Sequence, residues 1–428
     1  MDGWKADWQW VVDGGWLQVG DAMQNHDYDP YHLMQDFPRI IITMTYRLNI
    51  FGFLSCAALS AESPAQPAGN YGFWDQRMAI EWTYANAPLF GGNPENISVG
   101  GLSAGAYSAI FQLYYDTYLP DAKDRIIKRM YLYSNAVGIQ PKPICSEEAE
   151  EQFDEMCSRF NIDAALAPAE KLSKLRAVPS RDIVDQILTL KTHTFRAGTD
   201  GAFIPSNFLS SIHSGAFAAL LKDHGVKVML GEVENEEMLY RLVNPAFSYD
   251  SLILQLNNYY PSSVAESLLS SGLYDIPNKD AKKEEWRDCF AKIVADCQVH
   301  ATIRGFASCL LSGGKGLPMD HVMRYRICWR AKSLDEWLDP KVGLCHAAVV
   351  PIWWMSGTRA GYTKEDLKKV REWLEPQYRF LKGDHVQWGM SSEKQVRIFR
   401  NDGSIGIVDD ENWETGLKVW EAMGKGSL

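Results

Sequence analysis

The sequence has no excess of basic side chains and no long run of apolar residues. Its 428 residues include 43 Lys and Arg against 54 Asp and Glu, which leaves a net charge of −11. Clustered Lys and Arg are needed to neutralise phosphates, so this balance argues against nucleic acid as a partner. No apolar stretch approaches the roughly 18 residues of a membrane-spanning helix. We therefore expect no membrane span and no nucleic-acid function, and the sequence leaves the oligomeric state open.

The eight cysteines include no Cys-x-x-Cys pair, which removes the usual zinc-site and thioredoxin-type interpretations. Cys145 and Cys157 could form a disulfide in an oxidising compartment, and reduced thiols of a cytosolic protein are an equal alternative. The start of the chain has neither the basic nor the apolar segment of a signal peptide. The location expected by default is cytoplasmic, or secreted if an upstream segment is missing.

Short apolar runs, each followed by a loop and a helix-like segment, recur through the chain. This alternation is typical of a parallel sheet with helices on both faces, so we expect an α/β fold with a mostly parallel central sheet. Without repeats or long linkers, residues 1–428 are predicted to form one domain with a helix-rich insertion at about 240–320. The candidate strands are Trp10–Val12, Ile40–Tyr46, Ile97–Val99, Met130–Tyr133, Val226–Leu230 and Tyr325–Cys328.

Two stretches carry apolar side chains at helical spacing. The residues that share a face are Trp286, Phe290, Ile293 and Cys297 in the first stretch, and Trp413, Leu417 and Trp420 in the second. Such stripes are typical of helices that pack against a core. We interpret both as core packing and not as a cofactor site.

The only Gly-x-Ser-x-Gly motif places Ser103 between Gly101 and Gly105. A strand-like run precedes it and a helix-like segment follows, as in a nucleophile elbow. The serine of such an elbow lies on a tight, strained turn, and glycines two residues away on either side avoid a collision. Ser103 is therefore the candidate nucleophile, with a glycine-rich turn lacking chemistry as the alternative.

A second glycine pair, Gly14 and Gly15, follows the first candidate strand. A tetrahedral intermediate needs hydrogen-bond donors preset toward its oxygen, and paired glycines let backbone amides approach a substrate closely. The candidate oxyanion-hole donors are the amides of Gly15, Trp16 and Ala104. A plain turn is the alternative.

A serine hydroxyl needs a neighbouring base, and the base needs a group that orients it. Among nine histidines, His346 stands out because it lies in a loop of small residues after a candidate strand. Four carboxylates within residues 232–237 follow the strand Val226–Leu230. A run of this kind is ordinarily a solvated loop, and composition cannot choose among its members.

Several blocks in the same order resemble the type-B carboxylesterase/lipase family of α/β-hydrolases, a family that includes the cholinesterases. The blocks that carry the resemblance are Tyr46–Leu54, Asn70–Arg77, Phe90–Pro94, the Ser103 elbow and Asp200–Pro205. The resemblance implies Glu236 as the acid and His346 as the base, and a structural ion pair between Arg47 and Asp75. It also implies an α/β-hydrolase fold, a small-molecule ester substrate, and a mechanism without metal or organic cofactor.

The chain also departs from the family pattern. Leu102 replaces the usual glutamate before the nucleophile, Trp16 replaces a glycine, Glu237 replaces a glycine, and Val349 replaces an acidic residue. Thirteen residues precede the first glycine pair, far fewer than in the family. We expect either an incomplete, N-terminally shortened sequence or a reduced sheet edge with a more open cleft.

The residues together predict a serine carboxylic-ester hydrolase that works through an acyl-enzyme. Two alternatives stay open at this point. One is a non-catalytic, cholinesterase-like binding domain. The other is an acyltransferase that uses the same acyl-enzyme and passes the acyl group to an alcohol or an amine.

Overall fold

A computed structural model describes residues 6–12, 17–20, 29–62, 69–138, 140–336, 338–356 and 361–427, with only the backbone for 6–12. Its centre is an eight-stranded sheet in the order β10-β9-β8-β7-β4-β3-β1-β2. All neighbouring strands pair in parallel except β9 and β10, which are antiparallel. The strands are β1 (Ala6–Val12), β2 (Ile40–Thr43), β3 (Gly92–Leu102), β4 (Ile127–Tyr133), β7 (Lys227–Val233), β8 (Val322–Ile327), β9 (Gln395–Phe399) and β10 (Ile405–Asp409). A separate parallel pair consists of β5 (Lys142–Pro143) and β6 (Gly198–Thr199).

The six predicted strands and the mostly parallel α/β architecture are confirmed. The predicted bounds were wrong for β2, which ends at Thr43 and not at Tyr46, because this edge strand pairs only with the short β1. The central strand β3 begins at Gly92, five residues before the predicted start. The hairpin of β9 and β10 was not predicted.

Side chains of the central strands alternate between two apolar cores, as the pleat requires. Met130 and Leu132 of β4 enter one core, whereas Tyr131 and Tyr133 enter the other. Helices covering the first face include α4 (Tyr71–Asn86), α5 (Ala104–Thr117), α9 (Phe208–His213), α10 (Ala216–Asp223), α15 (Ala301–Leu311) and α18 (Trp413–Ser427). The second face is covered by α1 (Tyr31–Asp36), α16 (Val350–Trp354) and α17 (Lys364–Lys382).

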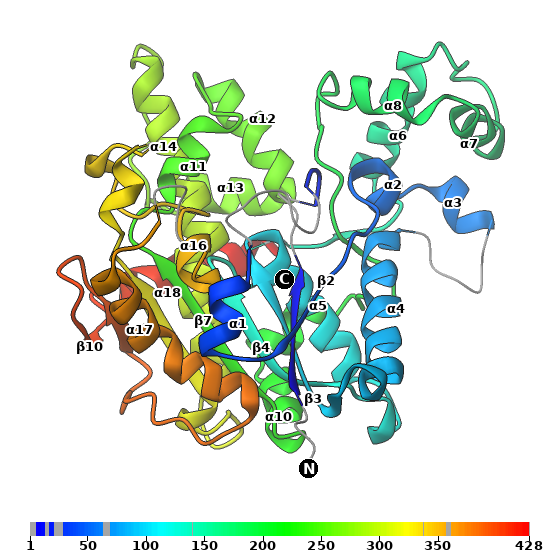
Figure 1. Ribbon diagram of the computed structural model, residues 1–428. Coiled ribbons are helices and arrows are strands. Elements are labelled where there is room, and N and C mark those ends of the chain that lie inside the picture. Colours follow the sequence, from blue (N-terminus) through cyan, green and yellow to red (C-terminus); the bar gives the residue numbers. More distant parts are fainter. Residues whose placement is uncertain are drawn as a thin grey trace.

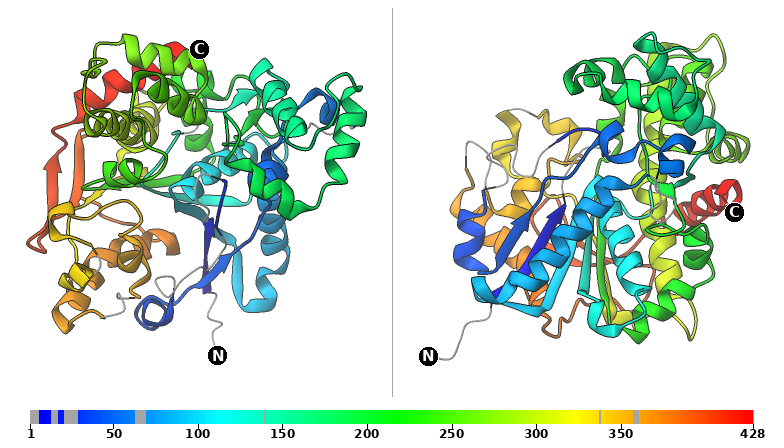
Figure 2. Two further views of the ribbon diagram at one scale, coloured as in Figure 1. Left: turned by 90° about the horizontal axis from the view of Figure 1, so that it is seen from above. Right: turned by 90° about the vertical axis from the view of Figure 1, so that its right-hand side faces the viewer.

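Two further groups of helices lie above one edge of the sheet, at the upper left and upper right of Figure 1. Figure 2 shows the same two groups from above. The first, between β7 and β8, comprises α11 (Glu237–Leu242), α12 (Tyr249–Tyr259), α13 (Ser262–Ser270) and α14 (Lys283–Ala295). The second comprises α2 (Asn49–Phe53), α3 (Ala57–Glu62), α6 (Glu147–Arg159), α7 (Pro168–Arg176) and α8 (Ser180–Ile187).

Both apolar stripes are packed as predicted. Trp286, Phe290, Ile293 and Cys297 are all buried in the core of the helices between β7 and β8, and Cys297 lies on a π-helical turn, Asp296–His300, that follows α14. In α18, Trp413 and Trp420 are buried against the first face of the sheet, with Leu417 packed beside them.

The ion pair implied by the resemblance is present, since Arg47 and Asp75 lie 2.7 Å apart. Cys145 and Cys157 are separate thiols in this structure, and Cys145 lies 3.1 Å from the hydroxyl of Ser60. Among the helices of the described part of the chain, none combines the length and the apolar character needed to cross a membrane.

Candidate active site

Ser103, Glu236 and His346 follow the carboxyl ends of β3, β7 and β8, respectively. These strands are parallel and belong to one sheet, so their carboxyl ends meet at one edge, where open α/β sheets bind ligands. The backbone ladder continues to that edge. Ser103 donates its N–H to the carbonyl of Tyr133 over 2.8 Å, and Ser134 donates to Gly231 over 2.8 Å.

Ser103 adopts the strained turn expected of a nucleophile elbow. Its φ of 55° and ψ of −114° place a non-glycine residue in a region that L-residues rarely occupy, and such strain is typical of functional sites. Its carbonyl accepts the N–H of Ala106 over 3.0 Å, which starts α5. Ala104 is the first residue of this helix, with Gly101 in β3 and Gly105 in the first turn of α5. The positive end of the α5 dipole therefore lies beside Ser103.

His346 and Glu236 form a buried pair. Nδ1 of His346 donates to Oε2 of Glu236 over 2.6 Å, and the two side chains are 2% and 0% exposed. The second oxygen, Oε1, accepts the backbone N–H of Val233 over 2.9 Å. The loops that carry the pair are joined as well, because His346 donates its backbone N–H to the carbonyl of Asn235 over 3.3 Å. This arrangement fixes the orientation of the imidazole and leaves its Nε2 as the atom that can accept a proton.

The four carboxylates after β7 differ sharply in their surroundings. Glu236 is fully buried and Glu232 is 3% exposed, whereas Glu234 is exposed and Glu237 is half-buried. Glu232 and Glu236 therefore differ from the solvated carboxylates that a run of this kind ordinarily contains. Local composition cannot reveal this difference, because it depends on which side chains the neighbouring strands and helices supply.

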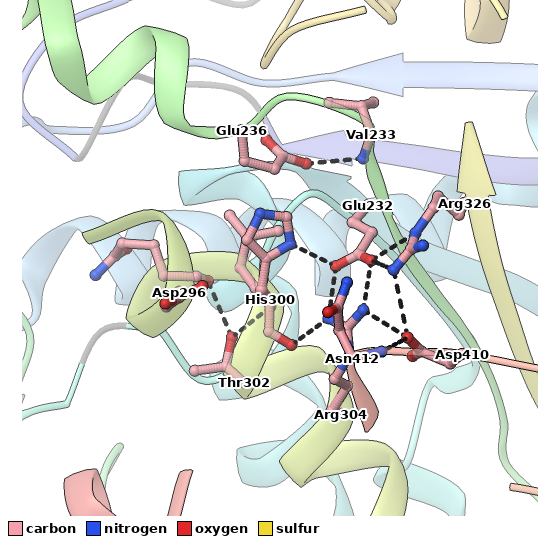
Figure 3. A network of polar contacts seen from close by, with 12 residues as sticks. Glu232, Val233, Glu236, Asp296, His300, Thr302, Arg304, Arg326, Asp410 and Asn412 are labelled. Carbon is pink, nitrogen blue, oxygen red and sulfur yellow. Dashed lines mark hydrogen bonds and ion pairs between the residues drawn. The ribbon is translucent and has the colours of Figure 1, made fainter. Parts of the chain in front are cut away.

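Glu232 is the centre of a charge network behind the site (Figure 3). Arg304 donates to both of its oxygens over 2.9 and 2.8 Å, Arg326 donates over 2.7 Å, and Nδ1 of His300 donates over 2.7 Å. Asp410 accepts from Arg304 over 2.8 Å and from Arg326 over 3.3 Å. The network joins β7 and β8 to the π-helical turn, to α15 and to the loop before α18. Sequence reasoning missed it, since its members are up to 178 positions apart (410 − 232).

The network shifts the titration of its members. Burial acts to raise the pKa of Glu232, but Arg304, His300 and Arg326 outweigh it and hold that pKa well below the ordinary value of 4.5. Burial acts to lower the pKa of His300, but the carboxylate of Glu232 outweighs it, so the pKa of His300 lies above 6.5. Arg304 opposes that rise and Asp296 supports it.

Tyr240 is a neighbour of the pair that the sequence did not indicate. Its fully buried ring lies 6.0 Å from the imidazole of His346, measured between centroids. It stands four residues after Glu236, one turn along α11, and that spacing is the signal that could have identified it. The ring screens the imidazole from water on that side.

Of the predicted oxyanion-hole donors, Ala104 lies at the start of α5, whereas Gly15 and Trp16 lie outside the described residues. The chain just after them is held in place by Gln18. Its Nε2 donates to the carbonyl of Phe195 over 2.6 Å, and its Oε1 accepts the N–H of Phe195 over 3.1 Å.

An apolar cavity of about 360 Å³ lies between the two helix groups. Its walls include Val184, Ile187 and Leu188 from α8 and the segment after it, and Tyr259 at the end of α12. The Tyr259 ring lies 6.2 Å from that of Tyr240, which in turn faces His346. No group of three or more His, Cys, Asp or Glu side chains suited to a metal ion occurs among the residues that the structure describes.

Comparisons with known proteins show the family of the chain. The model of the "Carboxylesterase family" matches residues 10–372. An uncharacterized esterase/lipase of Schizosaccharomyces pombe is 40% identical over 425 residues, which cover 98% of this chain and 77% of the relative. A carboxylic ester hydrolase of Gibberella moniliformis is 35% identical over 432 residues, covering 100% of this chain and 78% of the relative. Acetylcholinesterase of Electrophorus electricus is 28% identical over 254 residues, covering 56% of this chain and 36% of the relative. The chain belongs to the carboxylesterase family, it has the α/β-hydrolase fold of that family, and it is a carboxylic ester hydrolase.

Proposed function

We propose that the protein hydrolyses esters through an acyl-enzyme formed on Ser103. Nε2 of His346 takes the hydroxyl proton as Oγ attacks the ester carbonyl, and the imidazolium then donates that proton to the leaving alcohol. Water enters by the same route, with His346 again as the base, and releases the acid. No step in this sequence requires a metal or an organic cofactor.

The buried pair of His346 and Glu236 is the observation that carries the proposal. A carboxylate 2.6 Å from Nδ1 holds the imidazole in the tautomer whose Nε2 is free to accept a proton, and it stabilises the imidazolium. Three adjoining contacts support this role, namely the Val233 amide on Glu236, the Asn235 carbonyl on the backbone of His346, and the ring of Tyr240.

The proposed oxyanion hole consists of the backbone amides of Gly15, Trp16 and Ala104. The Ala104 amide stands at the N-terminus of α5, directly after the nucleophile. Negative charge that develops on the carbonyl oxygen is stabilised there by a preset donor and by the helix dipole. Each donor is expected to contribute about 10²–10³-fold to kcat.

We further propose that the substrate is an ester with an apolar acyl or alcohol part. The cavity of about 360 Å³ is large enough for a medium-length chain, and aliphatic side chains of α8 dominate one wall. The Tyr259 ring in its wall lies 6.2 Å from the ring of Tyr240, and that ring lies 6.0 Å from the imidazole of His346.

A covalent inhibitor tests the proposal directly. Diethyl p-nitrophenyl phosphate should label the intact protein once, at Ser103, with stoichiometric release of p-nitrophenol and loss of p-nitrophenyl acetate hydrolysis. Ser103→Ala should abolish labelling, while the exposed Ser210→Ala should leave it unchanged. Folded protein that fails to label would contradict the acyl-enzyme and favour the non-catalytic binding domain. A label on another residue would contradict Ser103 as the nucleophile.

Hydrolysis and acyl transfer share every step up to the acyl-enzyme. They differ in whether water or an alcohol then attacks it, so the reaction products distinguish them. Adding a competing alcohol to the p-nitrophenyl ester reaction should leave the free acid as the main product. A transferred ester as the main product at low alcohol concentration would identify an acyltransferase instead.

A further inference from the structure

A second polar cluster lies beside the small sheet of β5 and β6. Its Arg196 is buried, whereas the side chains of Lys142 and Glu148 are 15% and 40% exposed. Lys142 from β5, Glu148 from the first turn of α6 and Arg196 from the segment before β6 line a cavity of about 30 Å³. The remaining walls come mostly from small or apolar residues, among them Phe53, Pro143 and Gly198. On this measure one water occupies about 10–15 Å³, so the space accommodates a single small ion or two to three waters.

The two cations share only one carboxylate. Oε2 of Glu148 pairs with the ammonium of Lys142, and Oε1 accepts the hydroxyl of Ser262 over 2.6 Å. Each oxygen of Glu148 therefore has a partner other than Arg196. Arg196 is 8% exposed, and its guanidinium makes one hydrogen bond, from Nη2 to the carbonyl of Asn257 over 3.1 Å. Its Nη1 is buried and has no hydrogen-bond partner among the described residues.

A buried N–H of a charged guanidinium without an acceptor costs free energy. Among the residues that the structure describes, the cluster has two positive charges, Lys142 and Arg196, and one negative charge, Glu148, which leaves an excess of one positive charge. The cavity adjoins both cations. A negatively charged occupant would satisfy the donor and the charge at once.

We propose that this cavity binds a monovalent anion of halide size, held between the guanidinium of Arg196 and the ammonium of Lys142. The excess of one positive charge selects a single negative charge, and the volume excludes phosphate, sulfate and organic carboxylates. The site is distinct from the triad, and it does not depend on the mechanism proposed for Ser103.

The titration of the two cations is consistent with this assignment. Burial and, to a smaller extent, the charge of Arg196 lower the pKa of Lys142 to about 8, against the opposing effect of Glu148. Burial also lowers the pKa of Arg196 to about 10, while Glu148 and Tyr260 act to raise it. An anion would raise both values. By linkage, its affinity should fall as the pH rises through about 8 and Lys142 loses its proton.

The position of the site suggests what the anion stabilises. Arg196 follows Phe195, whose backbone N–H and carbonyl both bond to the side chain of Gln18. The preceding residues, Thr192 and Thr194, receive hydrogen bonds from Gln152 of α6 through their carbonyls. The anion would stabilise the position of residues 192–196, which bond to Gln152 of α6 and to Gln18.

Thermal unfolding of the whole protein in sodium chloride, against sodium gluconate at equal ionic strength, tests the site. Gluconate is too large for the cavity. Chloride should raise Tm saturably by roughly 1–3 °C. Arg196→Gln should lose this increment, and Arg176→Gln, which alters an exposed arginine paired with Glu62, should keep it. Equal Tm in the two salts, or an increment that survives Arg196→Gln, overturns the proposal and leaves the cavity to water.

Two further variants keep the test decisive if Arg196→Gln does not fold. Lys142→Gln should weaken the response to chloride, whereas Glu148→Gln removes the competing carboxylate and should lower the half-saturating chloride concentration roughly ten-fold. A gain of affinity on removing a carboxylate is not expected of a purely structural ion pair. Bromide-soaked crystals should show an anomalous peak within hydrogen-bond distance of Nη1 of Arg196, and no peak there would contradict the assignment.

Discussion

Val233 donates its backbone N–H to Oε1 of Glu236 over 2.9 Å, so the strand that carries the acid also orients it. The other oxygen of Glu236 receives Nδ1 of His346. The neighbour of Val233 in β7 is Glu232, which two arginines and His300 hold from the opposite side. The orientation of the imidazole therefore depends on a strand end that is fixed by a buried charge network.

Glu236→Gln should lower kcat for p-nitrophenyl acetate about 10³–10⁴-fold with little change in KM. The amide cannot stabilise the imidazolium, and its NH₂ group favours the wrong tautomer of His346. The matched control is Glu234→Gln, two residues earlier and exposed, which should retain full activity. Full activity of Glu236→Gln would show that Glu236 is not the acid, and an equal large loss in both variants would show that the effect is not specific to Glu236.

Glu232→Gln should lower the free energy of unfolding by about 3–5 kcal/mol, because it takes the central carboxylate from the buried Arg304 and the half-buried Arg326 and leaves them only Asp410. Urea midpoints measure the change. Glu62→Gln, which breaks an exposed pair with Arg176, should leave the midpoint unchanged.

The effect of Glu232→Gln on stability should depend on pH. The pKa of Glu232 is lowered in the folded protein, so its contribution is present above about pH 4.5 and is lost as the pH falls through the folded value. The difference between wild type and Glu232→Gln should therefore shrink on acidification below pH 4.5. A difference that grows in acid would contradict the lowered pKa.

The sequence predicted the strands and the nucleophile elbow, which have local patterns. It did not predict the features that depend on contacts between distant segments. Apolar runs located six strands, and the Gly-x-Ser-x-Gly spacing located the elbow. The hairpin of β9 and β10 was missed although its signal is present, since Asn401-Asp402-Gly403 separates two alternating segments. Attention to turn residues would have found it.

The choice among four carboxylates could not be made from composition. Glu232 and Glu236 are buried because Arg304, Arg326 and His346 come to them from elements 72–110 positions away, whereas Glu234 meets none of these partners. Arg196 is a similar case. Nothing near it in the sequence distinguishes a guanidinium that will be buried beside Lys142 from one on the surface.

His300→Gln should alter the pH dependence of stability. The pKa of His300 is raised in the folded protein, chiefly by Glu232 against burial. Its contribution is therefore complete below about pH 6.5 and is lost as the pH rises through the folded value. The variant should be less stable than wild type by about 1.5–3 kcal/mol at pH 6, and the difference should fall toward alkaline pH. Arg304 and Asp296 also face the ring and stay unchanged. Urea midpoints at pH 6, 7.5 and 9 that show a constant difference would mean that His300 stays neutral.

Val184→Trp should shorten the acyl chains that the enzyme accepts. Val184 lines the apolar cavity and is 46% exposed, so an indole there fills space without disturbing the core. The ratio of kcat/KM for p-nitrophenyl octanoate to that for p-nitrophenyl acetate should fall about ten-fold or more. Leu89→Trp, at an exposed position outside the cavity, should leave the ratio unchanged. If Val184→Trp also leaves it unchanged, the acyl chain does not enter this cavity, while hydrolysis of the acetate would still report an intact triad.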